Sequence, residues 1–154
     1  MKTDNLIFSF VKQLSKNKDL KAPSKGFTKL ADSIAFNQDL AIEELVLSGN
    51  DIGEEGAIAI AKSLEVMKKG LKTLDLSNAG ITPKGISSIF SAFIANKSYQ
   101  TSLTELTLSN NTIGKAGGEV LCKWFSTADK FSLRKLFLSS TKTRAGRSFE
   151  GNLS

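Results

Sequence analysis

Apolar and polar residues recur in one pattern along most of the chain, and this pattern predicts strands. The segments that begin at Ile42, Leu71, Leu103 and Leu133 read IEELVLSGNDI, LKTLDLSNAGI, LTELTLSNNTI and LRKLFLSSTKT, and they align as L-x-x-L-x-L-S-x-N-x-I. Their starts lie 29, 32 and 30 residues apart. The alternation L-x-L predicts one short strand per segment, and stacking of the repeats makes the strands parallel. The leucines expected to point inward are Leu45 and Leu47, Leu74 and Leu76, Leu106 and Leu108, and Leu136 and Leu138.

The stretches between these strands have the periodicity of amphipathic helices. Gly56, Gly85 and Gly117 each follow a strand segment by four positions, and Gly26 stands in the same place before an earlier helix. Apolar residues recur one, four, five and eight positions after each glycine, which places them on one face of a helix. They are Phe27, Leu30, Ala31 and Ile34; Ala57, Ile60, Ala61 and Leu64; Ile86, Ile89, Phe90 and Phe93; and Leu121, Cys122 and Phe125. We therefore predict that Cys122 is a core thiol, and the same count from Asn5 predicts a further helix near the start of the chain.

An asparagine ends two of the four strand segments. Asn50 and Asn111 hold this position, whereas Ala79 and Thr141 replace it in the second and fourth segments. An asparagine there is expected to bond the backbone of adjacent turns, and the loss of such a buried bond costs about 1–3 kcal/mol. We expect the second turn to be looser than the first and third.

The period of about 29 residues and the wording LSGNDIGEEGAIAIAKSL resemble the ribonuclease-inhibitor-like class of leucine-rich repeats. The irregular segment KAPSKGFTKLADSI and the replaced asparagines are most similar to the repeats of CARMIL-type actin regulators. The resemblance implies an α/β solenoid of about four to five repeats, with a curved parallel sheet inside and helices outside. One domain is expected over residues 1–154, with irregular helices at 1–41, regular repeats at 42–141 and a polar tail or truncated repeat at 142–154. Neither end shows a polar cap, so we expect a piece of a longer protein or ends that something else covers.

The composition restricts the catalytic, metal-binding and disulfide chemistry that the chain can support. The chain of 154 residues has no histidine and a single cysteine, which excludes Ser-His-Asp and Cys-His catalysis, most zinc sites and an internal disulfide. We predict a protein that is not an enzyme and uses no metal or cofactor. No apolar run is long enough for a signal peptide or a membrane span, and the lone thiol fits a reducing compartment, so we expect a cytoplasmic location.

The net charge of +6 leaves two other readings open. One is a basic surface for lipid or nucleic acid, which we do not favour because the lysines are scattered among acidic residues without interleaved aromatics. The other is a GTPase-activating regulator similar to the Ran-specific one, which would need an arginine or a polar set at the strand ends. Arg134, Arg144 and Arg147 lie in the last segment only.

The strand positions that point away from the core form the predicted binding surface, because the curvature of a solenoid makes this face concave. Its candidate residues are Glu43, Glu44, Val46, Asp75, Glu105, Thr107, Arg134, Lys135 and Phe137. They grade from acidic to basic, and Phe137 is expected to be the one exposed aromatic anchor. The alternative for Phe137 is packing against a missing neighbouring repeat or the chain's own tail. The predicted function is a protein-binding scaffold in actin or small-GTPase regulation, whose partner is another protein. Self-association is also expected, through an uncovered strand around Leu136 and Leu138.

Overall fold

The four leucine segments form the predicted parallel sheet. The computed structural model describes residues 24–36, 42–127, 129–139, 141–142, 148–149 and 152–153. In it β1 (Glu44–Val46), β2 (Thr73–Asp75), β3 (Glu105–Thr107) and β4 (Lys135–Phe137) pair in parallel and in chain order. Leu45, Leu74, Leu106 and Leu136 are direct partners across the four strands, so the leucine column is in register as predicted.

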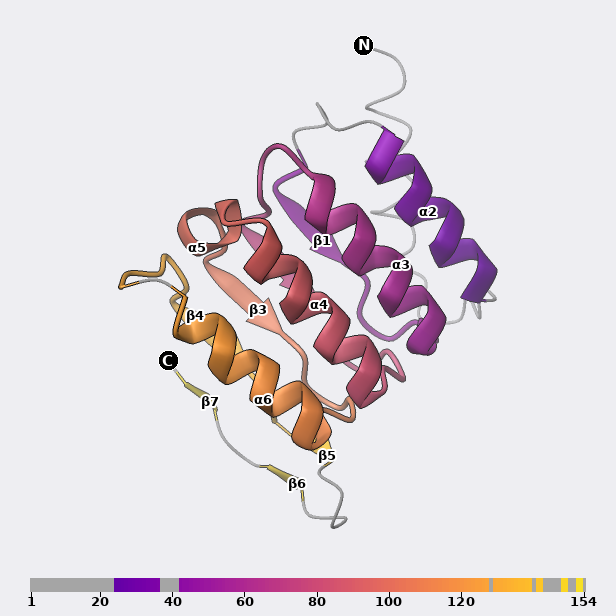
Figure 1. Cartoon of the computed structure of the whole chain (residues 1–154). Helices are drawn as coiled ribbons and strands as arrows, with labels where there is room; N and C mark the ends of the chain where they lie inside the picture. The colour runs from indigo at the N-terminus through magenta and orange to yellow at the C-terminus, as the bar shows by residue number, and fades with distance from the viewer. Residues whose placement is uncertain are drawn as a thin grey trace.

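One layer of helices covers the sheet on a single side (Figure 1). α2 (Ser24–Phe36), α3 (Gly53–Val66), α4 (Pro83–Ala95) and α6 (Gly114–Phe125) succeed one another in this layer, each packed on the next. The short helix α5 (Ser98–Ser102) lies between α4 and β3 and was not predicted. It occupies the extra residues of the repeat with the 32-residue spacing. The architecture is the α/β leucine-rich-repeat solenoid that the sequence predicts, and the predicted helix near Asn5 lies outside the described residues.

Apolar side chains between the two layers form one continuous core. The inward leucines of β1, β2 and β3 are at most 1% exposed. Towards the C-terminal end the core becomes aromatic, with Trp124 packed near Phe90 and Phe93 at centroid distances of 5.7 and 5.2 Å. The Tyr99 hydroxyl donates to the carbonyl of Leu64 at 3.2 Å, and burial raises the pKa of this phenol. Hydrophobic burial between the layers is thus the main force that holds the repeats together.

Three of the glycines from which the helix positions are counted, Gly56, Gly85 and Gly117, allow the helices to approach the preceding turns closely. We call them the register glycines. A Cβ atom at Gly85 would lie 2.7 Å from Ile81 Cγ2 and 2.9 Å from Ala57 Cβ. At the same turn the Thr82 hydroxyl accepts a hydrogen bond from the Gly85 amide at 3.4 Å, and Pro83 opens α4. The helix therefore starts where the sequence provides a cap, a proline and a residue without a side chain.

Asn111 forms hydrogen bonds with the turn of the second repeat, which has Ala79 in place of an asparagine. Its Oδ1 accepts from the amides of Ala79 and Ile81 at 3.2 and 3.0 Å, both in the second repeat. Its Nδ2 donates to the carbonyl oxygens of Leu76 and Leu108 at 2.7 and 3.0 Å. The missing asparagine at Ala79 thus leaves these amides bonded, because Asn111 bonds back to the preceding turn. The premise that the second turn lacks asparagine bonds is therefore wrong, and a looser second turn stays a prediction.

The prediction that Cys122 and Phe125 lie on the core face of α6 is also wrong. Cys122 is exposed and Phe125 is 38% exposed, whereas Trp124, one position earlier, is fully buried. The fifth position after each register glycine faces the next helix: Ala61 lines the groove between α3 and α4, and Phe90 contacts Trp124 of α6. No helix succeeds α6 among the described residues, so its equivalent position, Cys122, faces solvent.

The tail of the chain covers the outer edge of the sheet. β7 (Asn152–Leu153) pairs antiparallel with β4, and β5 (Thr141–Lys142) pairs with β6 (Ser148–Phe149) in a separate ribbon. In Figure 1 β7 lies beside the edge of the sheet, past α6. The prediction that β4 has an uncovered edge is wrong, and self-association through this end remains a prediction.

Candidate functional site

The outward residues of β1 to β4 lie side by side on the open face of the sheet. Pairing places Glu44 beside Thr73, Thr73 beside Glu105, and Glu105 beside Lys135. A second row has the same register and consists of Val46, Asp75, Thr107 and Phe137. Glu43 and Arg134 precede the first and last strands, and both are exposed. The structure therefore brings the nine predicted residues together on one surface, which we call the concave face.

Ion pairs between neighbouring strands neutralise part of its charge. Lys72 Nζ lies 2.8 Å from Glu43 Oε1, and Lys135 Nζ lies 3.1 Å from Glu105 Oε2. Both pairs are largely exposed, and such pairs contribute about 0–1 kcal/mol. The predicted gradient from acidic to basic is consequently weaker than the sequence suggests. Glu44 and Arg134 have no ion pair within the described part of the chain.

Asp75 has a structural role as well as a place on this face. Its Oδ1 accepts from the backbone amide of Ser77 at 2.9 Å and from the Ser77 hydroxyl at 2.7 Å. One carboxylate oxygen is therefore used to close the turn after β2. A substitution at Asp75 would change this turn as well as the charge of the concave face.

Phe137 is half-buried, so the expectation of an exposed side chain is wrong, and its role as a binding anchor stays a prediction. The residue is partnered in the sheet by Thr107 on one side and by Asn152 of β7 on the other. The pairing with β7 agrees with the alternative that Phe137 contacts the chain's own tail. The large apolar side chains that are exposed, Phe36, Val66 and Phe125, lie on the helices instead.

The residues described by the structure contain no group of three or more His, Cys, Asp or Glu side chains that could hold a metal ion. None of the described helices combines the length and the apolar character needed to span a membrane. The charges and the strand register of its outward residues characterise the site.

Comparison with known proteins agrees with the repeat geometry. The family model described as "Leucine Rich repeat" matches residues 42–61, 71–90 and 99–122, which are the strand, turn and helix of three successive repeats. Ribonuclease inhibitor from Sus scrofa is 40% identical over 82 residues, 53% of this chain and 17% of that protein. The chain is a leucine-rich-repeat protein of the ribonuclease-inhibitor-like class.

Two further relatives match a larger share of this leucine-rich-repeat chain. The Rho GTPase-activating protein gacW of Dictyostelium discoideum is 30% identical over 112 residues, 73% of this chain and 10% of that protein. Capping protein, Arp2/3 and myosin-I linker protein 3 of Mus musculus is 31% identical over 113 residues, 73% of this chain and 8% of that protein. The chain thus spans less than a fifth of the length of these relatives.

A solved structure, "Leiomodin-1 Actin-Binding Site 2 (ABS2)", superposes with a TM-score of 0.59 at 23% identity, covering 83% of this chain and 76% of that one. At this identity the likeness shows the fold alone. It agrees with the leucine-rich-repeat arrangement of one sheet and one helical layer.

Three of the serines at the ends of the strand segments make hydrogen bonds within this leucine-rich-repeat fold. The hydroxyls of Ser109 and Ser139 lie 3.0 Å apart in a hydrogen bond between neighbouring repeats, and the Ser77 hydroxyl bonds Asp75. These hydroxyls stabilise the turn at which the chain leaves the sheet. Their contacts explain why the serines do not belong to the predicted binding surface.

Sequence reasoning missed a groove at the opposite, amino-terminal end of the strands. It lies where the chain enters the sheet, and Lys69 and Phe131 are among its lining residues. Neither belongs to a strand, so the alternation that identified the concave face gave no signal for them. The extra residues of the longest repeat, which form α5, were the one indication that this end is irregular.

Proposed function

We propose that this chain is a non-catalytic scaffold that binds another protein on its concave face, in the cytoplasm and in actin or small-GTPase regulation. The observation that carries the proposal is the continuous row of outward side chains across four registered strands, from Glu44 to Lys135, with the exposed Arg134 directly before its last member. A concave surface with charges at both ends suits a partner of complementary charge.

The names of the relatives indicate which partner proteins to test first. One is named as a Rho GTPase-activating protein, another as a linker of capping protein, Arp2/3 and myosin-I, and a structure of the same fold as an actin-binding site. These names describe those proteins and guide the choice of candidates here. Monomeric actin and a Rho-family GTPase are the first candidates to measure.

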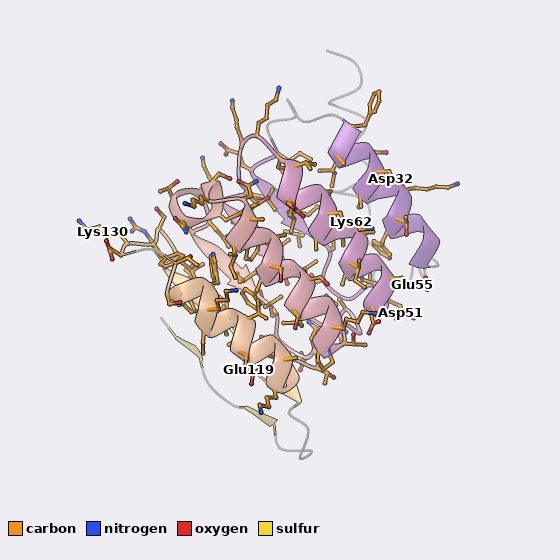
Figure 2. All side chains as sticks on the ribbon, in the orientation of Figure 1. Asp32, Asp51, Glu55, Lys62, Glu119 and Lys130 are labelled. Carbon is orange, nitrogen blue, oxygen red and sulfur yellow. The ribbon has the colours of Figure 1, made fainter. Side chains whose placement is uncertain are left out.

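A charge-reversal experiment tests the proposal. The variant Glu44→Lys with Glu105→Lys alters the concave face, and it leaves Asp75 in place because Asp75 closes a turn. The matched control, Glu55→Lys with Glu119→Lys, makes the same charge change on the helical layer (Figure 2). We expect the concave variant to lose partner binding in a pull-down and the control to retain it, with both unfolding at temperatures close to that of the unaltered protein.

Retention of the full set of partners by a folded concave variant would contradict the proposal and move attention to the helical layer. GTP hydrolysis by the captured GTPase provides a second readout. We expect no acceleration by this chain. Acceleration that disappears in Arg134→Ala would instead support a GTPase-activating role.

A further inference from the structure

A groove of about 570 Å³ crosses the sheet at the amino-terminal ends of the strands. It is bounded by the loops that lead from the helices into β2, β3 and β4, and α5 lies at this end of the molecule (Figure 1). Its lining includes cationic, hydroxyl and apolar side chains, namely Lys69, Lys72, Arg134, Thr101, Phe131 and Leu133. The groove continues the concave face, because Arg134 belongs to both.

The groove carries positive charge that no described side chain neutralises. Lys72 is paired with Glu43 at 2.8 Å, and Glu43 is the one acidic residue of the lining. Lys69 and Arg134 are exposed and have no ion pair in the part of the chain that the structure describes. Two unpaired cations at a concave surface concentrate positive potential and attract anionic groups.

The same lining also offers apolar surface. Phe131 and Leu133 pack against the core but are only half-buried, so part of each side chain faces the groove. A free inorganic anion would leave this apolar surface in contact with water. A peptide that carries both carboxylates and an apolar side chain would use both features.

The wall beside α5 is fixed by packing. A Cβ atom at Gly70 would collide with Ser102 Oγ and lie 2.9 Å from Ser98 Oγ, so this loop lies in close contact with α5. The preceding strand also anchors this end, since the Thr104 hydroxyl and amide donate to the Lys72 carbonyl at 2.9 and 2.8 Å. The groove is therefore formed before any ligand arrives, which lowers the cost of binding.

We propose that this groove binds an extended acidic segment of a partner protein, with two carboxylates at Lys69 and Arg134 and an apolar side chain on Phe131 and Leu133. The inference deepens the proposed scaffold function and depends on it. Arg134 is level with Lys72 two strands away, and Lys69 stands three residues before Lys72. Two strand spacings across the sheet and up to three residues along the chain separate the two cations by about 10–14 Å. An extended peptide rises about 3.3 Å per residue, so the two carboxylates should stand about three to four residues apart.

The probe is a fluorescein-labelled hexapeptide, Ser-Glu-Leu-Ser-Glu-Ser, with Ser-Gln-Leu-Ser-Gln-Ser as its uncharged match. We expect fluorescence polarisation to show binding of the acidic peptide and no binding of its match. The variant Lys69→Glu with Arg134→Glu should bind at least about tenfold more weakly. Raising the salt from about 0.1 M to about 1 M shortens the Debye length from about 10 Å to about 3 Å and should weaken binding of the acidic peptide.

A matched control makes the same change of charge away from the groove. Lys62→Glu with Lys115→Glu alters exposed residues of α3 and α6, and Lys62 lies on the helical layer in Figure 2. This control should bind as the unaltered chain does. The milder variant Lys69→Gln with Arg134→Gln should show intermediate weakening, which keeps the test valid if charge reversal disturbs folding.

Equal binding of the two peptides, or equal affinity of the groove and control variants, would overturn the inference. Phosphatidylserine vesicles form a further arm: vesicle binding that requires Lys69 and Arg134, without peptide binding, would identify a lipid surface and also overturn it. The concave variant Glu44→Lys with Glu105→Lys should keep at least its affinity for the peptide. Loss of partners in that variant together with absent peptide binding would remove the groove inference and leave the proposed function standing.

Discussion

The helices α3 and α6 have the same sequence register but different surroundings. The fifth residue after the register glycine is Ala61 in α3, which is 4% exposed, and Cys122 in α6, which faces solvent. α3 has a neighbour on both sides, α2 and α4, whereas the described neighbour of α6 is α4 alone. Burial in a solenoid therefore depends on the adjacent repeat as much as on the repeat's own sequence.

The largest difference between interior and end is expected for the first leucine of the strand segment. Leu103 is fully buried before β3, and its equivalent before β4, Leu133, is half-buried. Leu103→Ala should reduce the free energy of unfolding by about 2–5 kcal/mol, as for other buried leucines. Leu133→Ala should cost less, because part of the side chain already contacts water. Urea unfolding of both variants measures the difference, and equal losses would break the comparison.

A smaller effect is expected at the asparagine that connects the second and third repeats. Asn111→Ala would leave the buried amides of Ala79 and Ile81 without their acceptor. The cost should be about 1–3 kcal/mol in the free energy of unfolding. Hydrogen exchange of those two amides provides the local readout. Unchanged protection in the variant would show that the turn of the second repeat does not depend on Asn111.

The smallest effect is expected at the contact between the amino-terminal ends of α3 and α4. The Thr82 hydroxyl donates to Glu54 Oε2 at 2.6 Å and Lys84 Nζ lies 3.1 Å from Oε1, and these contacts hold the pKa of Glu54 below its ordinary value of 4.5. A carboxyl whose pKa is lowered on folding adds stability above its unfolded pKa and loses it as the pH falls through the folded value. The thermal stability of Glu54→Gln should therefore lie slightly below that of the unaltered chain at neutral pH and approach it in acid. A difference that does not change with pH would exclude the ionised carboxylate as its cause.

The sequence predicted the repeated parts of the fold well because their cause is periodic. The leucines of β1 to β3 and the core faces of α3 and α4 result directly from apolar spacing, and all of them are buried as expected. The parallel register is predicted as well, because each strand segment has the same length and the same serine at its end. The rows of outward residues on the concave face are consequences of that register.

The errors fall where periodicity stops. Pairing of the outer edge of β4 depends on β7, whose sequence carries none of the repeat pattern. Exposure of Cys122 depends on whether another helix packs against α6, and the groove depends on loops and on α5. The charge of the concave face depends on ion pairs between neighbouring strands. The composition of the chain alone does not reveal these pairs.

The most direct test of burial by neighbouring repeats is a comparison of thiol reactivity at equivalent positions of α3 and α6. The unaltered chain presents Cys122, and the double variant Ala61→Cys with Cys122→Ala presents a single thiol at the buried position. We expect native Cys122 to react with a thiol reagent nearly as fast as it does in denaturant. The thiol at position 61 should react at least about a hundredfold more slowly, which corresponds to an opening free energy of about 2.7 kcal/mol. Slow native labelling of Cys122, at a rate close to that of the thiol at position 61, would contradict the claim that the adjacent repeat sets burial in this solenoid.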